Sequence, residues 1–343
     1  MRSVSYLSQC VGDCRRWRSG LCILLFIGWM PALGVSPATG SSDVTYAPLP
    51  WVELGAGFWL SRGESAWQIS FFELDDELGR LRGRSRLEWD SLDVFMLRVH
   101  GTLRVAPWMR VYASYGFGDV VGGRNTDTDW IGALDEPDNL QFRSVADTSG
   151  EVHMLDMRLA FRISEWINIG DGRGNWDIVF GYRQLEEDLR DRRGVMTVLD
   201  GERVRQPFPD LNSTYSFDWR SLLVGLEGEF ELADRLRARG LVLILYGSQY
   251  RGEGFWNLRD DFRAEPPNFI HRASGGAGVE LKLSVLYDIT PNVFAEAGLW
   301  RFQMRNKDGT DRLFLADGEE ATTSLDWVRT VRQGYFMSVG ARF

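Results

Sequence analysis

The chain has 343 residues, 13% of them aromatic, and a formal net charge of −9. An acidic chain lacks the positive surface on which nucleic-acid binding depends, so this class of function is excluded. Beyond the first residues no run of about eighteen apolar residues occurs, so a membrane protein built from helices is not expected.

The N-terminus has the composition of a secretory signal peptide. Arg15, Arg16 and Arg18 precede an apolar run at Leu21–Val35, and small residues follow up to Ala38. A basic region, a short apolar region and small residues at the cleavage point are typical of export signals. We expect residues 1–38 to be removed and 39–343 to form one domain. The three cysteines, Cys10, Cys14 and Cys22, lie in the removed part, so structural disulfides and a cysteine nucleophile are not expected.

Apolar and polar residues alternate in ten later segments, which is the period of a β-strand with two different faces. In the last segment Tyr335, Met337, Val339 and Phe343 share one face, and small or polar residues share the other. Such a strand fits lipid on one side and a polar interior on the other. The expected strands lie near residues 52–60, 95–104, 110–117, 155–163, 177–183, 221–230, 235–246, 279–288, 293–299 and 333–343.

The connections between these strands alternate between long polar stretches and short turns. The long stretches are 61–83, 118–150, 187–213, 247–272 and 303–330, and the short turns are 106–108, 171–175, 233–234 and 290–292. We therefore predict an all-β fold, a single ten-stranded antiparallel transmembrane β-barrel in the bacterial outer membrane, with long extracellular loops and short periplasmic turns. A soluble β-sandwich would show the alternation but not this rhythm of connections.

The stretch after the third strand holds two carboxylates, Asp127 and Asp129, two residues apart. On an extended strand both side chains point to the same side. Neighbouring carboxylates raise each other's pKa and can share a proton, which suits water activation or metal binding. The alternative is a solvated pair of the kind that polar loops often contain.

Several segments, in this order, resemble the omptins, ten-stranded outer-membrane proteases of Gram-negative bacteria. The similar segments are Ser85–Trp89, Gly122–Asn125, Asp127–Trp130, Val224–Gly228, Thr290–Asn292 and Asn306–Gly309. The resemblance covers residues 51–343. It implies a protease in which an acidic pair and an Asp-x-His pair on the opposite wall hold the attacking water.

Asp127 and Asp129 match the acidic pair of the omptins. The second pair is expected in the stretch after the seventh strand, but residues 254–263 contain no histidine. His271, working with Asp260 or Asp261, is the candidate replacement for the missing base.

The omptins also bind lipopolysaccharide on the outer face of the barrel, and Tyr182 matches one of the residues that do so. Gln184 and Glu186 depart from the basic pattern expected beside it. The resemblance implies outer-membrane lipid and lipopolysaccharide as partners. We expect no other cofactor and no metal site.

Three functions remain open at this stage. The first is an omptin-like barrel whose protease site is lost or altered, and which binds a peptide or protein through its surface loops as a monomer. The second is an active endopeptidase that cleaves basic peptides at the cell surface. The third is a narrow pore, although a barrel of about ten strands has little interior space and its charged side chains are expected to pair with one another.

Overall fold

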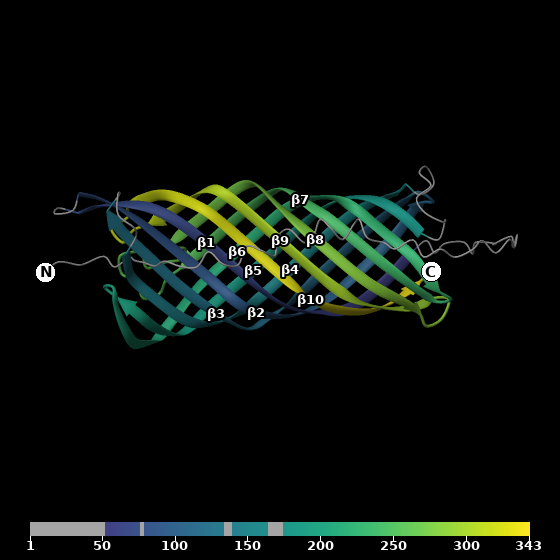
Figure 1. Ribbon diagram of the computed structural model, residues 1–343, viewed down its shortest axis with the longest axis horizontal. Helices are drawn as coiled ribbons and strands as arrows, with labels where there is room; N and C mark the ends of the chain where they lie inside the picture. The colour runs from purple at the N-terminus through teal and green to yellow at the C-terminus, as the bar shows by residue number, and fades with distance from the viewer. Residues whose placement is uncertain (1–51, 76–78, 134–138, 164–173) are drawn as a thin grey trace, which may run out of the picture. The chain divides into compact units, whose positions relative to one another are not determined.

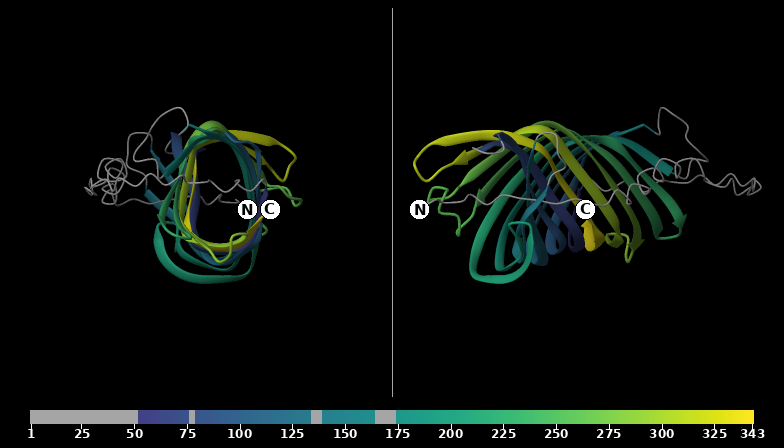
Figure 2. Two further views of the ribbon diagram at one scale, coloured as in Figure 1. Left: turned by 90° about the vertical axis from the view of Figure 1, so that its right-hand side faces the viewer. Right: turned by 60° about the vertical axis from the view of Figure 1, so that its left-hand side comes forward.

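The computed structural model describes residues 52–75, 79–133, 139–163 and 174–343, and they form ten antiparallel strands that close into one ring (Figures 1 and 2). Each strand pairs with its neighbours in sequence, and β1 pairs with β10 to close the ring. The predicted all-β fold with ten strands is confirmed. The expected signal peptide, 1–38, lies outside the described residues. The strands are β1 Val52–Asp75, β2 Gly79–Ala106, β3 Met109–Ala133, β4 Asn139–Arg162, β5 Gly174–Leu199, β6 Glu202–Ala233, β7 Leu236–Phe255, β8 Phe269–Asp288, β9 Val293–Phe314 and β10 Glu320–Arg342.

Short turns join the strands at the end of the barrel where the chain terminates (Figure 1). Pro107 and Trp108 connect β2 to β3, Asp234 and Arg235 connect β6 to β7, and residues 289–292 connect β8 to β9. These three turns agree with the prediction, whereas most of the fourth, 171–175, falls in a part that the structure does not describe. Within the described ranges, no helix has the length and apolarity needed to cross a membrane.

The long polar stretches differ from the expectation, because most of their residues lie in strands rather than in loops. The stretch 187–213 shows this best: β5 continues to Leu199, and β6 begins at Glu202. Asp200 and Gly201 form the turn between them with φ angles of 50° and 79°. Tight two-residue hairpin turns require positive φ at these positions, and Asp-Gly supplies it. Backbone hydrogen bonds extend the ladder whatever the polarity of the side chains.

A belt of exposed apolar side chains surrounds the barrel next to the short turns. It runs along residues 95–105 of β2 and 279–287 of β8, and it ends on Phe343, which is 70% exposed. A transmembrane strand needs about ten residues to cross the hydrocarbon layer. The belt has the height of one membrane, and the strands continue well beyond it.

β-Bulges above this belt exchange the inward and outward faces of several strands. On β3, Tyr115 and Phe117 are exposed on the outward face, and the register against β4 then shifts between Val120 and Arg124. A bulge inserts an extra residue and re-aims the side chains that follow it. Before the shift, odd-numbered residues such as Phe117 are exposed. After the shift Asn125, which also has an odd number, is buried.

Equivalent changes of face occur on β2, β7 and β8 at about the same height. On β2 the register shifts between Asp90 and Asp93, where Ser91 has a φ of 52°. Gly247 on β7 and Gly275 on β8 have φ angles of 60° and 77°, which glycine adopts without steric strain. The upper barrel therefore has its own inward-facing set of residues, which simple alternation from the belt does not predict.

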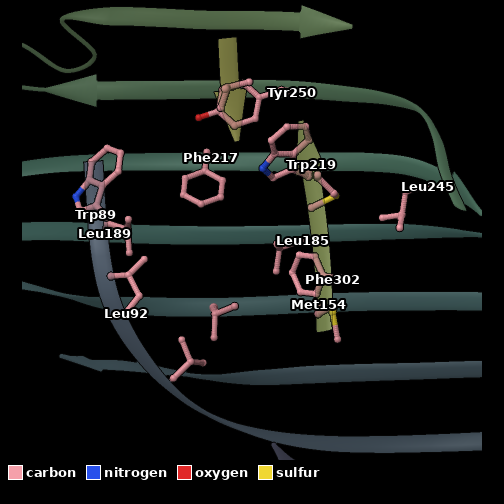
Figure 3. Close-up of a cluster of buried hydrophobic side chains, with 14 of the residues drawn as sticks. Trp89, Leu92, Met154, Leu185, Leu189, Phe217, Trp219, Leu245, Tyr250 and Phe302 are labelled. Atoms are coloured by element: carbon pink, nitrogen blue, oxygen red, sulfur yellow. The ribbon is translucent and has the colours of Figure 1, made fainter. Parts of the chain in front are cut away.

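Side chains fill the barrel interior at two levels. At the height of the belt, buried charges pair: Arg183 Nη2 lies 2.7 Å from Asp156 Oδ2, and its Nη1 contacts Glu280. Lumenal charges therefore pair with one another, as predicted. Above them lies an aromatic and aliphatic cluster to which all ten strands contribute, and Figure 3 shows part of it. Its labelled members are Trp89, Leu92, Met154, Leu185, Leu189, Phe217, Trp219, Leu245, Tyr250 and Phe302.

Candidate binding cavity

Asp127 and Asp129 line a cavity of about 450 Å³ in the part of the barrel beyond the apolar belt. The β3 bulge places both on the inward side of the strand. Their partners across the sheet are Leu87 and Ser144 for Asp127, and Ser85 for Asp129. The cavity thus brings together the two predicted site residues. The lining residues are Leu87, Asn125, Asp127, Asp129, Phe142, Ser144, Ala146, Asp191, Met196, Leu199, Phe208, Leu211, Ser213, Trp256, Leu258, Arg259, Asp260 and Asp261.

The wall of the cavity opposite β3 is the connection between β7 and β8, residues 256–268. Asn257 fixes this connection to β6, because its side chain donates to the carbonyl of Asp210 (2.8 Å) and accepts from the backbone N–H of Asn212 (2.7 Å). Its other side is tied to the β9–β10 hairpin, where the N–H of Ala316 donates to the carbonyl of Asp261. This wall of the cavity is therefore held by hydrogen bonds on both of its sides.

A third carboxylate, Asp191 of β5, lines the same cavity and was not predicted. It is buried, and it accepts hydrogen bonds from Thr148 Oγ1 (2.6 Å) and Trp89 Nε1 (3.1 Å). Burial raises the pKa of Asp191 to about 7, although the two hydrogen bonds favour its charged form. Asp191 is therefore partly protonated at neutral pH.

The acidic pair shares this shift towards the protonated form. Burial raises the pKa of Asp129 to about 6, against the opposing effects of a hydrogen bond from Ser85 and the charge of Arg259. Burial and the neighbouring charge of Asp129 raise the pKa of Asp127 well above its usual range. Ionising several neighbouring carboxylates in a desolvated site costs free energy, so the carboxylates of the cavity tend to remain protonated. A cationic ligand would displace these protons.

Two polar atoms on the β3 wall lack hydrogen-bond partners within the described part of the chain. They are Oδ1 of Asp129 and Nδ2 of Asn125, whose residues are 3% and 4% exposed. An unsatisfied buried polar group costs about 1–3 kcal/mol. Both residues line the cavity, so a ligand or ordered water there would satisfy an acceptor and a donor together.

Arg259 is the cationic side chain of the opposite wall. Its Nε and Nη2 donate to the two carboxylate oxygens of Asp261, at 2.7 and 2.6 Å. Its guanidinium also packs over the Phe262 ring, 4.8 Å from the centroid. Asp261 holds Arg259, which therefore offsets only part of the negative charge of Asp127 and Asp129.

The structure places His271 beneath the cavity rather than in its lining. His271 is fully buried on β8, where Nδ1 is 2.8 Å from Tyr215 Oη and Nε2 is 3.3 Å from Asp311 Oδ1. The expected partnership with Asp260 or Asp261 is therefore not found, and the carboxylate beside the imidazole is that of Asp311. The β7–β8 connection lifts Asp260 and Asp261 to the mouth, whereas the strand holds His271 within the aromatic cluster.

Tyr182 lies on the outer face of β5, as its position in the predicted strand required. Its hydroxyl donates to Gln184 at 3.4 Å, and Gln184 donates in turn to Glu186 at 2.5 Å. On the adjacent strand, Arg220 is paired with Asp218 at 2.6 Å. This face therefore presents carboxylates, with its basic side chain already neutralised.

No group of three or more histidine, cysteine or acidic residues is placed to hold a metal ion in the described part of the chain. The missed residues of the cavity, Asp191 and Arg259, carry no motif. Asp191 lies in a charged run that resembles a solvated loop, and only strand pairing brings it near Asp127. Arg259 follows Trp256 and Leu258 in a segment whose fold depends on contacts with β6.

Comparison with solved structures gives matches of different quality. The crystal structure of the outer membrane protease OmpT from Escherichia coli matches with a TM-score of 0.71 at 13% identity, covering 85% of this chain and 96% of that one. The translocator domain of the autotransporter NalP from Neisseria meningitidis gives 0.35 at 11% identity, covering 87% and 90%. The Pseudomonas putida toluene transporter TodX gives 0.28 at 7% identity, with the same coverage. At such identities the likeness to OmpT shows the fold alone.

Comparison at the level of sequence identifies a protein family. No curated protein matches the chain. Residues 67–339 match the family model described as Pom, Protochlamydia outer membrane protein. This match shows the predicted location, integral in the outer membrane. The omptin resemblance is supported for the fold, but membership of the omptins is not shown. Because the family model spans most of its length, the chain belongs to the Pom family of outer membrane proteins.

Proposed function

We propose that the protein is a non-proteolytic ligand-binding barrel whose cavity takes a basic, amphiphilic group such as a lysine or arginine side chain of a peptide. The observation that carries this proposal is the composition of the cavity, where Asp127, Asp129 and Asp191 face apolar walls. Arg259 is the cationic lining residue from the stretch 254–263, in which the omptin resemblance predicts a histidine and the sequence has none. The strand ends beyond the belt face the outside of the cell in this proposal, as the longer connections of outer-membrane barrels do.

The chemistry of the walls supports a cation with a hydrocarbon stem. Phe142, Met196 and Phe208 provide apolar contact for the stem, and the carboxylates provide acceptors for the charged end. Hydrogen bonds between ionised partners are shorter and about twice as strong as neutral ones. A bound cation would also lower the pKa values of the carboxylates and so stabilise their charged forms.

Proteolysis by the omptin mechanism is less well supported. A general base must lie within hydrogen-bond distance of the attacking water. His271 is instead engaged with Tyr215 and Asp311 beneath the cavity. A narrow pore is also less well supported, because side chains fill the described interior at two levels.

Hydrolysis by the carboxylates themselves is the second candidate function. Asp129 and Asp191 have raised pKa values of about 6 and about 7. Such values suit a general acid and a general base near neutral pH. The protein would then be an endopeptidase that uses Asp127 and Asp129 with Asp191 in place of histidine.

Substituting Asp127→Asn or Asp129→Asn is expected to weaken binding of an arginine-containing peptide about tenfold to a hundredfold, the range for losing one charge-assisted hydrogen bond. The refolded barrel would be titrated into a fluorescent diarginine peptide, and binding followed by anisotropy. Asp188→Asn is the matched control, because Asp188 is exposed on the outer face of β5. Its affinity is expected to equal that of the wild type.

Mass spectrometry of the peptide after the titration separates the two candidate functions. An intact peptide with weaker binding by Asp127→Asn supports the binding protein. Cleavage that Asp127→Asn and Asp191→Asn both abolish would establish the endopeptidase instead. Equal affinity of all variants for an intact peptide would contradict both functions of this cavity.

A further inference from the structure

A column of basic side chains lies on the outer face of β9, directly above the apolar belt. Arg301, Arg305 and Lys307 have the same parity as Leu299, which is 53% exposed, whereas the even-numbered residues from 302 to 306 are buried. All three basic side chains therefore point outward, and we name them the β9 ladder. Successive residues of a strand are about 3.3 Å apart, so the β9 ladder covers about 20 Å of strand.

The charges of the β9 ladder are not neutralised by the residues around it. Arg301 donates to the neutral amide of Gln333 at 2.8 Å. No ion pair is found for Arg305 or Lys307 among the residues that the structure describes. The residue opposite Arg305 on β8 is Ala277, whose small side chain leaves room for another molecule to approach. The β9 ladder is therefore open to an acidic partner.

A row of acidic side chains lies on another part of the outer face. Asp119 of β3, Glu151 of β4 and Asp188 of β5 are partners across adjacent strands, and all three are exposed. We name them the acidic row. Like charges directly opposite one another in a sheet repel each other. Within the described ranges no ion pair offsets this repulsion, so the acidic row is open to a basic partner.

The β9 ladder and the acidic row begin at the same level, on opposite sides of the ring. Arg301 is the next outward residue after Leu299 on β9. Asp119 is the next outward residue after Phe117, which is exposed on β3. Both patches therefore begin at the upper edge of the belt. In the closed ring of ten strands, β9 and β4 are five positions apart in either direction.

We propose that copies of this protein associate side by side in the outer membrane, with the β9 ladder of one copy against the acidic row of the next. Charge complementarity identifies the second copy as the occupant, because membrane insertion gives all copies one orientation and one depth. The two patches of neighbouring copies then meet at the same height. Two β9 ladders or two acidic rows would repel each other, which disfavours a two-fold symmetric dimer.

A contact between two different faces of the same protein is heterologous, and it repeats from copy to copy. Because the two faces lie on opposite sides of the ring, repetition produces a row of barrels rather than a closed pair. This row replaces the monomer expected from the sequence. The cavity at Asp127 and Asp129 takes no part in the contact, so the inference does not depend on the proposed function.

The lysines of the chain allow a direct test of the contact. The chain has two lysines, and Lys282 lies in the lumen, paired with Glu296 at 3.1 Å. Lys307 is the exposed one. A carbodiimide joins an amine to a carboxylate only where the two groups touch. In vesicles that hold unlabelled and nitrogen-15-labelled barrels, mass spectrometry is expected to find Lys307 of one copy joined to the acidic row of another.

Charge reversal tests the contact a second time. The ladder variant R301E/R305E and the row variant E151R/D188R are each expected to associate about tenfold more weakly than the wild type in sedimentation equilibrium at low salt, since an exposed ion pair contributes up to about fivefold. An equal mixture of the two variants is expected to associate as the wild type does, because each reversed patch then meets its complement. Association of the wild type is expected to weaken as salt is added, because the Debye length falls to about 3 Å at 1 M.

The matched control is R251E/R312E, which makes the same change in net charge as the ladder variant. Arg251 and Arg312 are exposed and have their own acidic partners, Glu253 and Glu320. Association of this control is expected to equal that of the wild type. Heat modifiability on electrophoresis shows whether each variant is folded, and R301Q/R305Q is the milder substitute for a ladder variant that does not fold. A wild type that remains monomeric at low salt, or a ladder variant that associates as strongly as the wild type, would overturn the proposal.

Discussion

Replacing Arg183 with methionine is expected to destabilise the barrel by about 3–5 kcal/mol, the range for removing one partner of a buried ion pair. Arg183 is 2% exposed, and it bridges Asp156 of β4 and Glu280 of β8. Asp156 would keep a second partner in Arg158 at 3.2 Å. Glu280 would lose the ion pair that the structure gives it and would remain buried with its charge.

Urea unfolding followed by tryptophan fluorescence measures this loss as a lower midpoint. A second change, Glu280→Gln, should recover much of the stability, because it removes the orphaned charge. Arg251→Met is the exposed control, since its pair with Glu253 lies at the surface and contributes at most about 1 kcal/mol. A midpoint for Arg183→Met equal to that of the control would show that this network does not stabilise the barrel.

The belt of the barrel was predictable because lipid is the solvent of its outer face. An apolar side chain at every second residue, as at Tyr335, Met337 and Val339, is required there, and the structure exposes all three. Above the belt water solvates the outer face, so an apolar side chain at every second residue is no longer required. The sequence of a strand there resembles the sequence of a polar loop. The Asp200–Gly201 turn was the available signal that β5 and β6 form one long hairpin.

The candidate site was predictable only in part, because it depends on bulges and on long-range pairing. Alternation from the belt would place Asp127 and Asp129 on the outside of β3, and the register shift after Val120 brings them inside. The Asp-x-Asp motif alone indicated that Asp127 and Asp129 act together, but it did not indicate which residues surround them. His271 and Asp311 are neighbours because β8 pairs with β9 at that residue, which no local pattern reveals.

The fold stability of this protein is expected to fall as the pH rises from about 4 to about 7, and Asp191→Asn is expected to remove a large part of that fall. The pKa of Asp191 is raised from 3.8 to about 7 by burial. Between these values the unfolded chain has released this proton and the folded chain still holds it. The unfolded state thus binds fewer protons, and stability decreases with increasing pH.

The size of the effect follows from the same shift. One pKa unit corresponds to about 1.4 kcal/mol, so Asp191 accounts for up to about 4 kcal/mol of this loss. Asparagine resembles the protonated acid, because its carbonyl oxygen can accept from Thr148 and Trp89. The variant is therefore expected to be more stable than the wild type at pH 8 and similar to it at pH 4. Asp127 and Asp129 have raised pKa values too, so a smaller slope remains.

Urea midpoints measured from pH 4 to pH 8 on both proteins provide the comparison. Asp188→Asn serves as the control, because its side chain faces outward from the same strand, and its curve should follow that of the wild type. Parallel curves for Asp191→Asn and the wild type would mean that Asp191 has the same pKa in the folded and the unfolded chain. The cavity would then be hydrated enough to keep its carboxylates ionised, and a basic ligand would bind it with little dependence on pH. A flatter curve for Asp191→Asn than for the wild type would instead mean that a basic ligand must displace the proton of Asp191. The affinity of the ligand would then rise through the pH range in which Asp191 ionises.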